Sequence, residues 1–329
     1  MPLLLLLALA MSLLIGSVSI PASQVVAALG GGEVERESWR YIILESRLPQ
    51  TVTAMLCGAS LAASGLMLQT AFRNPLAGPS ILGITNGASL GVAVVMLVTG
   101  GTLALQVSDV GLFLAGNLAV VVSAFIGAIA VIALLLLAST IVSSNLMLLI
   151  VGIMVSYLVS SVVSLVHTVA NADNIQSYVL WGMGSFNNVT LGQLPLFTVL
   201  TLVGLLQAVL LIKPLNALML GDEYARNLGV KVPQVRRWLL LSTGLLTAVS
   251  TAYCGPVAFI GLAVPHIARL LTRTADHLTL MPVTIVMGAV VALMCNVISV
   301  LPEHSVLPLN AVTPLFGAPV IIYIILKRN

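Results

Sequence analysis

Long apolar runs, separated by short segments rich in charge, glycine or proline, make up most of the 329-residue chain. Residues 120–138 contain no charged side chain and do not alternate between apolar and polar positions. The strands of a membrane barrel would alternate in this way over about ten residues. A helix needs about 20 apolar residues to cross a hydrocarbon core of about 30 Å, in which every backbone N–H and C=O must be paired. The pattern therefore predicts an all-α, polytopic membrane protein.

Charged, polar, glycine and proline breaks divide the chain into ten predicted spanning helices. They cover residues 3–20, 49–68, 80–99, 110–138, 145–169, 191–212, 235–254, 257–272, 281–300 and 309–326. Spans seven and eight are the least regular pair, because Gly255, Pro256 and Pro265 interrupt them, and a partly re-entrant arrangement stays open. We expect residues 1–329 to form a single transmembrane domain. No basic region precedes residues 3–20, which indicates a span rather than a signal peptide; a short cytoplasmic stub before residue 1 is left open.

Composition agrees with a lipid environment. Hydrophobic residues make up 59% of the chain, charged residues make up 7%, and the mean hydropathy is +1.15. A soluble domain carries about 25% charged residues to cover its surface. The net charge of +3 comes from basic residues scattered over the loops, without the patch that nucleic-acid binding requires. Cys57, Cys254 and Cys295 lack the paired spacing of disulfides or metal sites, so we expect small buried side chains and no bound metal.

Lysine and arginine are distributed unequally between the two sides that ten spans define. Ten of the 13 lie on the side of both termini, and three lie on the other side: Arg36, Arg40 and Arg47. Most acidic residues lie with these three. Because cytoplasmic loops carry an excess of Lys and Arg, the bias places both termini in the cytoplasm.

The sequence lacks the residues that would supply energy or catalysis. No acidic pair lies within a predicted span, as an ion-driven transporter would require. The chain has no G-x-x-x-x-G-K-[ST] loop for ATP phosphates and no Ser/His, paired-Asp or His-x-x-x-His arrangement of an intramembrane enzyme. We therefore expect a transporter subunit that is not itself an enzyme, binds no cofactor and is powered by another protein. An ion-driven secondary transporter is the alternative.

The loop at 213–233, on the predicted cytoplasmic side, contains a short predicted helix. Asp222 and Glu223 stand at its start and Gly229 at its end, matching the preferences of helix termini. About two turns of helix are not stable alone. A partner surface would stabilise it, but a solvated connector explains these residues equally well.

Several residue groups, in order along nearly the whole chain, carry a family resemblance. They are Arg47-Leu48-Pro49, Gly58 to Gly65, Phe72 to Pro79, Leu82 to Ala88, Trp181 to Ser185, Leu220 to Val230, Gly255 to Leu262, Val264 to Arg269, and Phe316 to Pro319. With these groups the sequence resembles the FecCD/BtuC-type permease family of bacterial ABC importers. Members of that family carry iron-siderophores, haem or vitamin B12 across the inner membrane.

The resemblance implies a type II ABC importer permease that forms a homodimer in the inner membrane, with a central path between the copies. It implies a cytoplasmic ABC ATPase dimer, which uses the ATP, docked on a coupling helix of Gly221, Asp222, Glu223, Ala225, Arg226, Leu228 and Gly229. It implies a cytoplasmic gate of Asn74, Pro75, Leu76, Ser143 and Ser144. An extracytoplasmic solute-binding protein would deliver the substrate, with an iron-siderophore favoured and haem or cobalamin open.

Two positions depart from the family pattern. Gln50 and Ser299 stand where many members have arginines that meet acidic residues of the binding protein. Docking is therefore expected to use Arg47, Arg36 and Arg40 instead.

Two structural roles are also predicted. The small residues Gly58, Ser60, Ser64 and Gly65 allow close helix packing. His266 is expected to bond a backbone carbonyl at the break that Pro265 makes in its helix.

Overall fold

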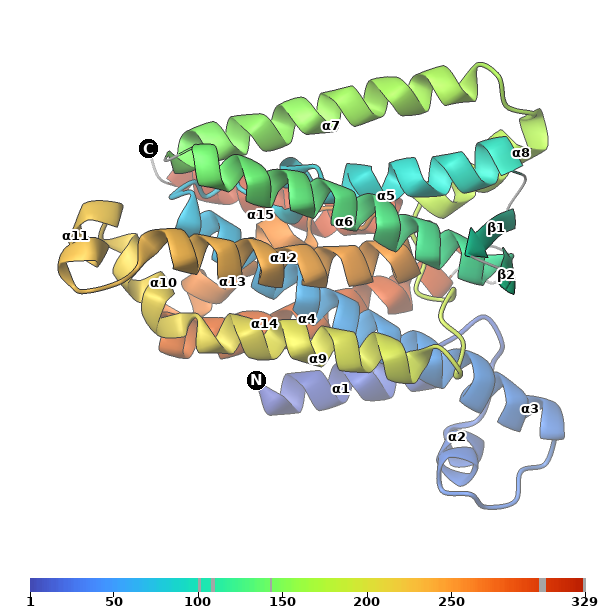
Figure 1. Ribbon diagram of the computed structural model, residues 1–329. Helices are drawn as coiled ribbons and strands as arrows, with labels where there is room; N and C mark the ends of the chain where they lie inside the picture. Colours follow the sequence, from blue (N-terminus) through green and yellow to red (C-terminus); the bar gives the residue numbers. More distant parts are fainter. Residues whose placement is uncertain (100–101, 108–109, 143, 302–305, 328–329) are drawn as a thin grey trace.

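The protein is a bundle of roughly parallel helices (Figure 1). The computed structural model describes residues 1–99, 102–107, 110–142, 144–301 and 306–327. Each predicted span corresponds to a helix, in one case with a short continuation. These are α1 (Pro2–Leu14), α4 (Leu48–Ala71), α5 (Ile84–Ala93) continued by η3 (Val94–Val98), α6 (Asn117–Ile141), α7 (Asn145–His167), α9 (Leu194–Leu210), α12 (Val232–Cys254), α13 (Ile260–Thr272), α14 (His277–Val300) and α15 (Leu309–Lys327). The predicted polytopic helical architecture is confirmed.

The helices differ in length and hydropathy. Four described stretches are long and apolar enough to cross a membrane: Glu37–Ala71, Asn117–Ile141, Leu146–His167 and His277–Val300. A fifth crossing arises if α9 and α10 (Ile212–Met219), which meet at 49°, form one bent span. Shorter apolar helices, α1, α5 with η3, α13 and α15, pack in the same bundle.

Helix α4 forms the centre of the bundle. In its most apolar stretch, 89% of the residues are buried. Gly58 lies against Gly288 of α14, and Gly65 lies against Gly261 of α13, so closely that a Cβ on either would overlap the opposite carbonyl oxygen. Ser64 adds a 3.2 Å hydrogen bond between its hydroxyl and that of Thr247 in α12. The predicted close packing is confirmed, and it is how helices gain contact where lipid offers no hydrophobic driving force.

The predicted start of the fourth span is wrong. Val110–Ala115 forms strand β2, which pairs antiparallel with β1 (Thr102–Val107), and α6 begins only at Asn117. The short hairpin stands outside the helical bundle at one end (Figure 1). Strand β2 is as apolar as a span, so hydropathy joined it to the helix that follows.

Most other span boundaries differ by a few residues from those predicted, and two of these differences have a visible cause or a large size. Helix α1 ends at Leu14 rather than at residue 20. Helix α5 begins at Ile84, because a 3₁₀ turn, η2 (Pro79–Leu82), comes first and Gly83 follows in the left-handed region with φ of 79°.

A non-helical stretch, residues 255–259, separates α12 from α13. Gly255 and Phe259 both have positive φ angles, 73° and 66°, which turn the chain sharply. Helix α13 has 13 residues, so it rises about 20 Å and is shorter than a hydrocarbon core. A pocket of about 240 Å³ opens beside this break, with Pro79, Phe259 and Leu262 in its lining.

The connections gather at two ends of the bundle (Figure 1). The α8 end carries α2 (Ala22–Leu29), α3 (Glu37–Tyr41), the hairpin and α8 (Ala172–Gly182); the π-helical turn η1 (Ile42–Arg47) leads from α3 into α4. The α11 end carries α10 and α11 (Asp222–Asn227). The basic-residue bias predicts that the α8 end is external and the α11 end is cytoplasmic.

Candidate functional site: coupling helix and gate segments

The predicted coupling helix corresponds to α11, a six-residue helix at the outermost point of its end (Figure 1). Gly221 before it and Gly229 after it have φ angles of 121° and 82°, which glycine adopts at no steric cost. Ala225 is fully buried, whereas Tyr224 and Leu228 are 51% and 58% exposed. A helix this short is not stable alone, and its exposed apolar side chains leave a surface for a partner.

Asp222 connects α11 to two other elements. Its Oδ1 lies 3.5 Å from Nη2 of Arg73, which follows α4, and its Oδ2 lies 3.6 Å from Nη2 of Arg236 in α12. Arg236 also donates from Nη1 to the carbonyl oxygen of Val142, at 3.2 Å. One carboxylate therefore contacts two guanidinium groups from separate segments of the chain.

The first predicted gate segment is a compact loop, residues 73–77, which we call the gate loop. The backbone N–H of Leu76 donates to Oδ1 of Asn74 at 2.9 Å. The backbone N–H of Ala77 donates to the Asn74 carbonyl at 3.0 Å. Nε2 of His266 in α13 donates to the Pro75 carbonyl at 2.8 Å. His266 thus bonds a backbone carbonyl, as predicted, but the carbonyl belongs to the gate loop rather than to the Pro265 break.

The second predicted gate segment is the α6–α7 turn, residues 142–144. A cleft of about 670 Å³ at the α11 end is lined by Arg73, Ser144, Asp222 and Tyr224, among others. The cleft thus brings Ser144 close to α11, whereas Asn74, Pro75 and Leu76 are not part of its lining, and Leu76 lines the pocket beside the α12–α13 break. Ser143 lies outside the described residues. The roles of these residues in gating and coupling stay predictions.

Arg47, predicted to dock a binding protein, does not have the exposure that this role needs. Its side chain is 5% exposed, and its guanidinium donates to the carbonyl oxygens of Leu13, Leu14 and Val18, at and just beyond the end of α1. The carbonyls of Leu13 and Leu14 lie in the last turn of α1, where the helix supplies no N–H to pair with them, so the arginine satisfies them. Arg47 is therefore corrected from a docking residue to a buried structural one.

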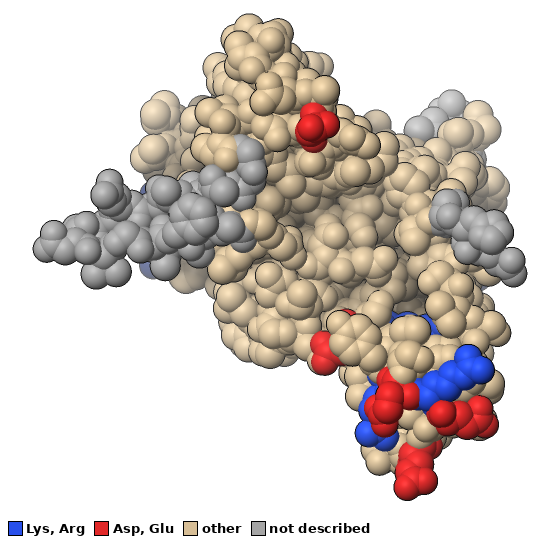
Figure 2. Space-filling model, turned by 90° about the vertical axis from the view of Figure 1, so that its right-hand side faces the viewer, with Lys and Arg blue, Asp and Glu red and all other residues tan. Residues whose placement is uncertain are grey.

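Arg36 and Arg40 stay candidates for docking. Arg36 is exposed, with its guanidinium carbon 5.0 Å from the centre of the Trp39 ring, and Arg40 is half-buried and donates to the Gly32 carbonyl. Figure 2 looks onto the α8 end and shows charged side chains of both signs gathered at one corner, beside an uncharged, hollowed surface. The exposed charges in the connector of residues 30–47, which carries α3, are Glu33, Glu35, Arg36, Glu37 and Glu45.

Gln50 and Ser299, which depart from the family pattern, line the same pocket at the α8 end. The pocket has a volume of about 170 Å³, and its lining also includes Asn296. Nε2 of Gln50 donates to Oδ1 of Asn296 at 2.8 Å, and Nδ2 of Asn296 donates to Oγ of Ser12 at 3.1 Å. These neutral, buried groups satisfy one another. Sequence reasoning missed the network because Gln50 and Asn296 are 246 residues apart.

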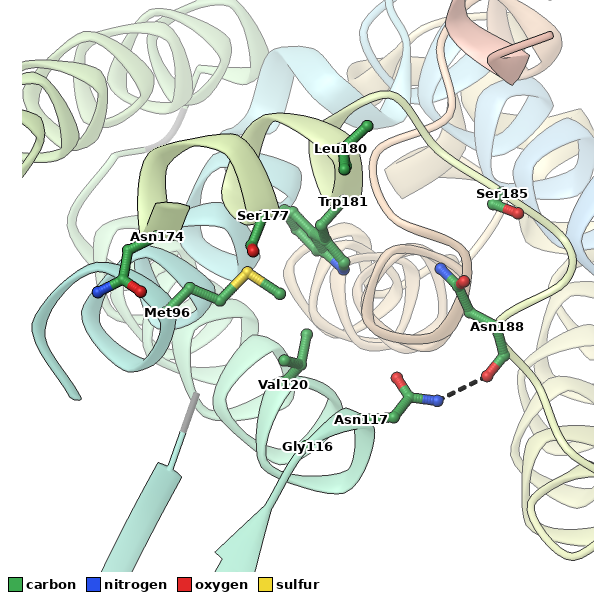
Figure 3. A pocket seen from close by; sticks show the side chains of 10 residues that line it. All are labelled: Met96, Gly116, Asn117, Val120, Asn174, Ser177, Leu180, Trp181, Ser185 and Asn188. Atoms are coloured by element: carbon green, nitrogen blue, oxygen red, sulfur yellow. Dashed lines mark hydrogen bonds between the residues drawn. The ribbon is translucent and has the colours of Figure 1, made fainter. Parts of the chain in front are cut away.

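A larger pocket, of about 390 Å³, lies beside α8 (Figure 3). Nδ2 of Asn117, at the start of α6, donates to the Asn188 carbonyl at 2.6 Å on one side of it. Trp181 and Met96 supply apolar lining, while Ser177 adds a hydroxyl (Figure 3). Separate segments form this pocket and no motif marks it, so it could not be found from the sequence.

Cys57, Cys254 and Cys295 are buried, which confirms the prediction that they are small buried side chains, and none of the three forms a disulfide. Within the part of the chain that the structure describes, no group of three or more His, Cys, Asp or Glu side chains could hold a metal ion.

Comparison with known proteins identifies the family. An ABC transporter permease of Methanocaldococcus jannaschii is 30% identical over 322 residues, covering 94% of this chain and 89% of that protein. The vitamin B12 import system permease BtuC of Klebsiella pneumoniae is 34% identical over 328 residues, covering 99% and 92%.

Solved structures agree with these relatives. A metal-chelate type ABC transporter in an inward-facing conformation has 30% identity and a TM-score of 0.84, covering 99% of this chain and 97% of that chain. PsaBC of Streptococcus pneumoniae, in complex with a Fab, has 16% identity and a TM-score of 0.57, covering 84% and 90%, and shares the fold. The sequence profile of the FecCD transport family matches residues 4–327, and the chain therefore belongs to the FecCD transport family.

Proposed function

We propose that this chain is the permease subunit of an ATP-driven importer for a metal chelate. The observation that carries the proposal is the position of α11: a helix too short to be stable alone, with Tyr224 and Leu228 exposed, beside a cleft that Ser144 also lines. A metal-chelate transporter and a vitamin B12 permease among the similar proteins support the substrate class. Within that class an iron-siderophore is the favoured cargo.

The same proposal assigns partners to the surfaces. An ABC ATPase dimer docks on α11 and hydrolyses the ATP, so the chain is not itself an enzyme. A solute-binding protein docks at the α8 end, where Arg36 and Arg40 contribute to the charged corner. A second copy of the chain completes the central path. The protein lies in the cytoplasmic membrane with both termini inside the cell, as the basic-residue bias favours.

Purification from native membranes in a mild detergent tests the assembly. Tagged chain should recover an ATPase and a solute-binding protein, and mass spectrometry of the ligand on that binding protein should identify a metal chelate. Recovery of the chain alone, together with uptake that collapses when the ion gradient is removed while ATP stays high, would support an ion-driven secondary transporter instead.

A double variant tests the role of α11. Glu223→Ala changes the start of α11, and Gly229→Pro changes the residue at its end. Gly229 has φ of 82°, a value that the proline ring cannot adopt. We expect uptake of the identified chelate to stop while the variant stays folded, as judged by its elution volume in size-exclusion chromatography. Normal uptake by this double variant would contradict the proposal.

A further inference from the structure

We infer that the pocket beside α8 is a subsite for the cargo, and that it selects an uncharged metal chelate whose organic ligand carries amide groups. The inference rests on the proposed function, because it names the kind of chelate that the importer carries. Its basis is the chemistry of the pocket of about 390 Å³ at the α8 end. The residues that line it supply carboxamides, hydroxyls and apolar side chains, and none of them is Asp, Glu, Lys, Arg or His.

Helix α8 supplies one wall of this pocket (Figure 3). Asn174, Ser177 and Trp181 follow one another at spacings of three and four residues, which places them on one side of the helix. The hydroxyl of Ser177 donates to the carbonyl oxygen of Asp173 at 3.0 Å, so the Ser177 oxygen is left to accept a hydrogen bond from a ligand.

The facing wall consists of Asn117, the first residue of α6, and Asn188, which lies between α8 and α9 (Figure 3). The 2.6 Å hydrogen bond from Nδ2 of Asn117 to the Asn188 carbonyl fixes the two residues relative to each other. Within the described part of the chain, no hydrogen bond engages the side-chain amides of Asn174 and Asn188. Each of these amides has two donor hydrogens and an acceptor oxygen for a ligand.

The apolar part of the lining is fixed by its own packing. Trp181 is 7% exposed, and its ring lies 6.1 Å from that of Tyr178, which in turn meets the ring of His167 edge-on at 5.1 Å. Met96 belongs to the π-helical turn η3, a kind of turn that is frequent at functional sites. The pocket thus has a fixed aromatic wall before any ligand arrives.

The charge of the lining decides which chelates fit. An ionised group loses much more free energy than a neutral amide when it leaves water without a partner. The lining has no cation to pair with a carboxylate-rich, anionic chelate, and Asp173, the one charged residue of α8, would repel it. An amide group, which is both donor and acceptor, finds complementary partners in Asn174, Asn188 and Ser177.

A side chain of the solute-binding protein is the other occupant to consider. The volume of about 390 Å³ lies within the range of about 300–1,000 Å³ that is typical of small-molecule sites. The combination of an apolar wall with a few polar groups is also typical of such sites, where the polar groups set the orientation of the ligand. These features favour the chelate itself.

The test uses the complex of this chain with its ATPase in nanodiscs, without the binding protein, and two chelates of radioactive gallium(III). One is the complex of an acetylated linear trihydroxamate, which is neutral and carries amide groups; the other is the citrate complex, which is anionic. Equilibrium binding should be saturable for the neutral chelate and at least about tenfold weaker for the citrate complex, because its charge finds no partner.

Alanine variants locate the binding. Asn174→Ala and Asn188→Ala should each weaken binding of the neutral chelate by about threefold to tenfold, as expected for hydrogen bonds between uncharged groups. Gln176→Ala removes an exposed amide from the same helix outside the pocket lining, and it should leave the affinity unchanged. An unchanged Tm for all three variants would show that folding is not the cause.

Equal affinity for the two gallium chelates, no saturable binding of the neutral one, or unchanged affinity in both pocket variants would overturn the inference. Variants that keep the affinity for the neutral chelate but bind the ligand-free binding protein more weakly would assign the pocket to that protein, and would overturn it as well. A reconstituted transporter that imports only anionic chelates would overturn the inference and leave the proposed function intact. The proposed function itself fails if ATP drives import of no chelate of either charge.

Discussion

Single side chains set how closely the helices approach. At Gly58 and Gly65 the backbone of α4 meets the carbonyl oxygens of Gly288 and Gly261, so neither glycine has room for a Cβ. Helix association in lipid depends on such contacts, because lipid tails are as apolar as the side chains. The position of α13 and α14 against α4 therefore depends on the absence of a few methyl groups.

Gly58→Ala tests this packing. The added Cβ would overlap the Gly288 carbonyl oxygen and the Cβ of Ala292, and separating the helices should cost about 1–3 kcal/mol. We expect a lower Tm for the purified protein in detergent, even though alanine favours helices. The same substitution at Gly192, where a Cβ meets no atom within 4 Å, is the control. Equal Tm values for the two variants would contradict the packing argument.

Arg47 and Arg36 should respond differently to the same substitution. Arg47→Gln removes a guanidinium from three backbone carbonyls near α1, and loss of such charged hydrogen bonds costs about 1.5–3 kcal/mol. We expect a lower Tm with unchanged affinity for the co-purified binding protein. Arg36→Gln, at the charged corner of the α8 end, should weaken that affinity and leave Tm unchanged. The opposite assignment of the two effects would restore Arg47 as a docking residue.

At the scale of elements, helix α14 begins with a side-chain cap. Asp276 Oδ1 accepts from the backbone N–H of Leu278 at 3.0 Å and from Nδ2 of Asn216 in α10 at 2.6 Å. Next to it, Oδ1 of Asn216 accepts from the backbone N–H of His277 at 2.9 Å, and Thr70 of α4 lies 2.8 Å from the histidine ring. The cap thus also connects α14 to the helix that precedes α11.

The cap predicts a pH-dependent contribution to stability. The Leu278 N–H first, and the Asn216 amide second, hold the pKa of Asp276 below its usual value. The contribution of the carboxylate is therefore present above the ordinary aspartate pKa and is lost as the pH falls through the lowered folded value. Asp276→Ala should lower the Tm at pH 7, and the difference from the unaltered protein should narrow in acid. Asp276→Asn, which keeps an acceptor for Leu278, should retain most of the Tm at pH 7.

The sequence predicted a helix and its end correctly where a suitable run of residues stops at a helix-breaking residue. Gly255 and Pro256 correctly mark the end of α12, and the terminal preferences at Asp222 and Gly229 correctly predict α11. Hydropathy could not separate β2 from α6, because a strand as apolar as Val110–Ala115 has the same average as a span. Helix ends that depend on a 3₁₀ turn or a tertiary contact, as at η2, leave no mark in hydropathy.

The candidate site was predictable in part for a similar reason. Residues close in sequence, such as 74–76 and 221–229, form recognisable strings. Asp222 contacts Arg73, which lies 149 positions earlier in the chain, and Arg236, which lies 14 positions later. No local sequence pattern encodes these contacts. Arg47 was misjudged because its charge placed it in an external loop, whereas the carbonyls at the end of α1 draw the side chain inward.

At the scale of the whole molecule, α7 is the least covered of the long helices. Only 28% of its most apolar stretch is buried, and it lies at the edge of the bundle (Figure 1). Its exposed side includes the large apolar residues Tyr157, Leu158 and Leu165, but also the hydroxyls of Ser160 and Ser164. Small residues four apart suit close packing against another helix. Hydroxyl groups at exposed positions of a span also suit a water-filled passage.

These features predict that α7 faces the central path between two copies rather than lipid. In the assembled transporter, Ser164→Cys should react with a membrane-impermeant maleimide added from outside, because water reaches it through the path. Leu206→Cys, 60% exposed on α9, should not react, because its surroundings are lipid. Cys57, Cys254 and Cys295 are buried and give a low background. Equal protection of both positions would place α7 in lipid and contradict a path between copies, whereas selective reaction at Ser164 would locate the path at the least covered of the four long apolar stretches that the structure describes.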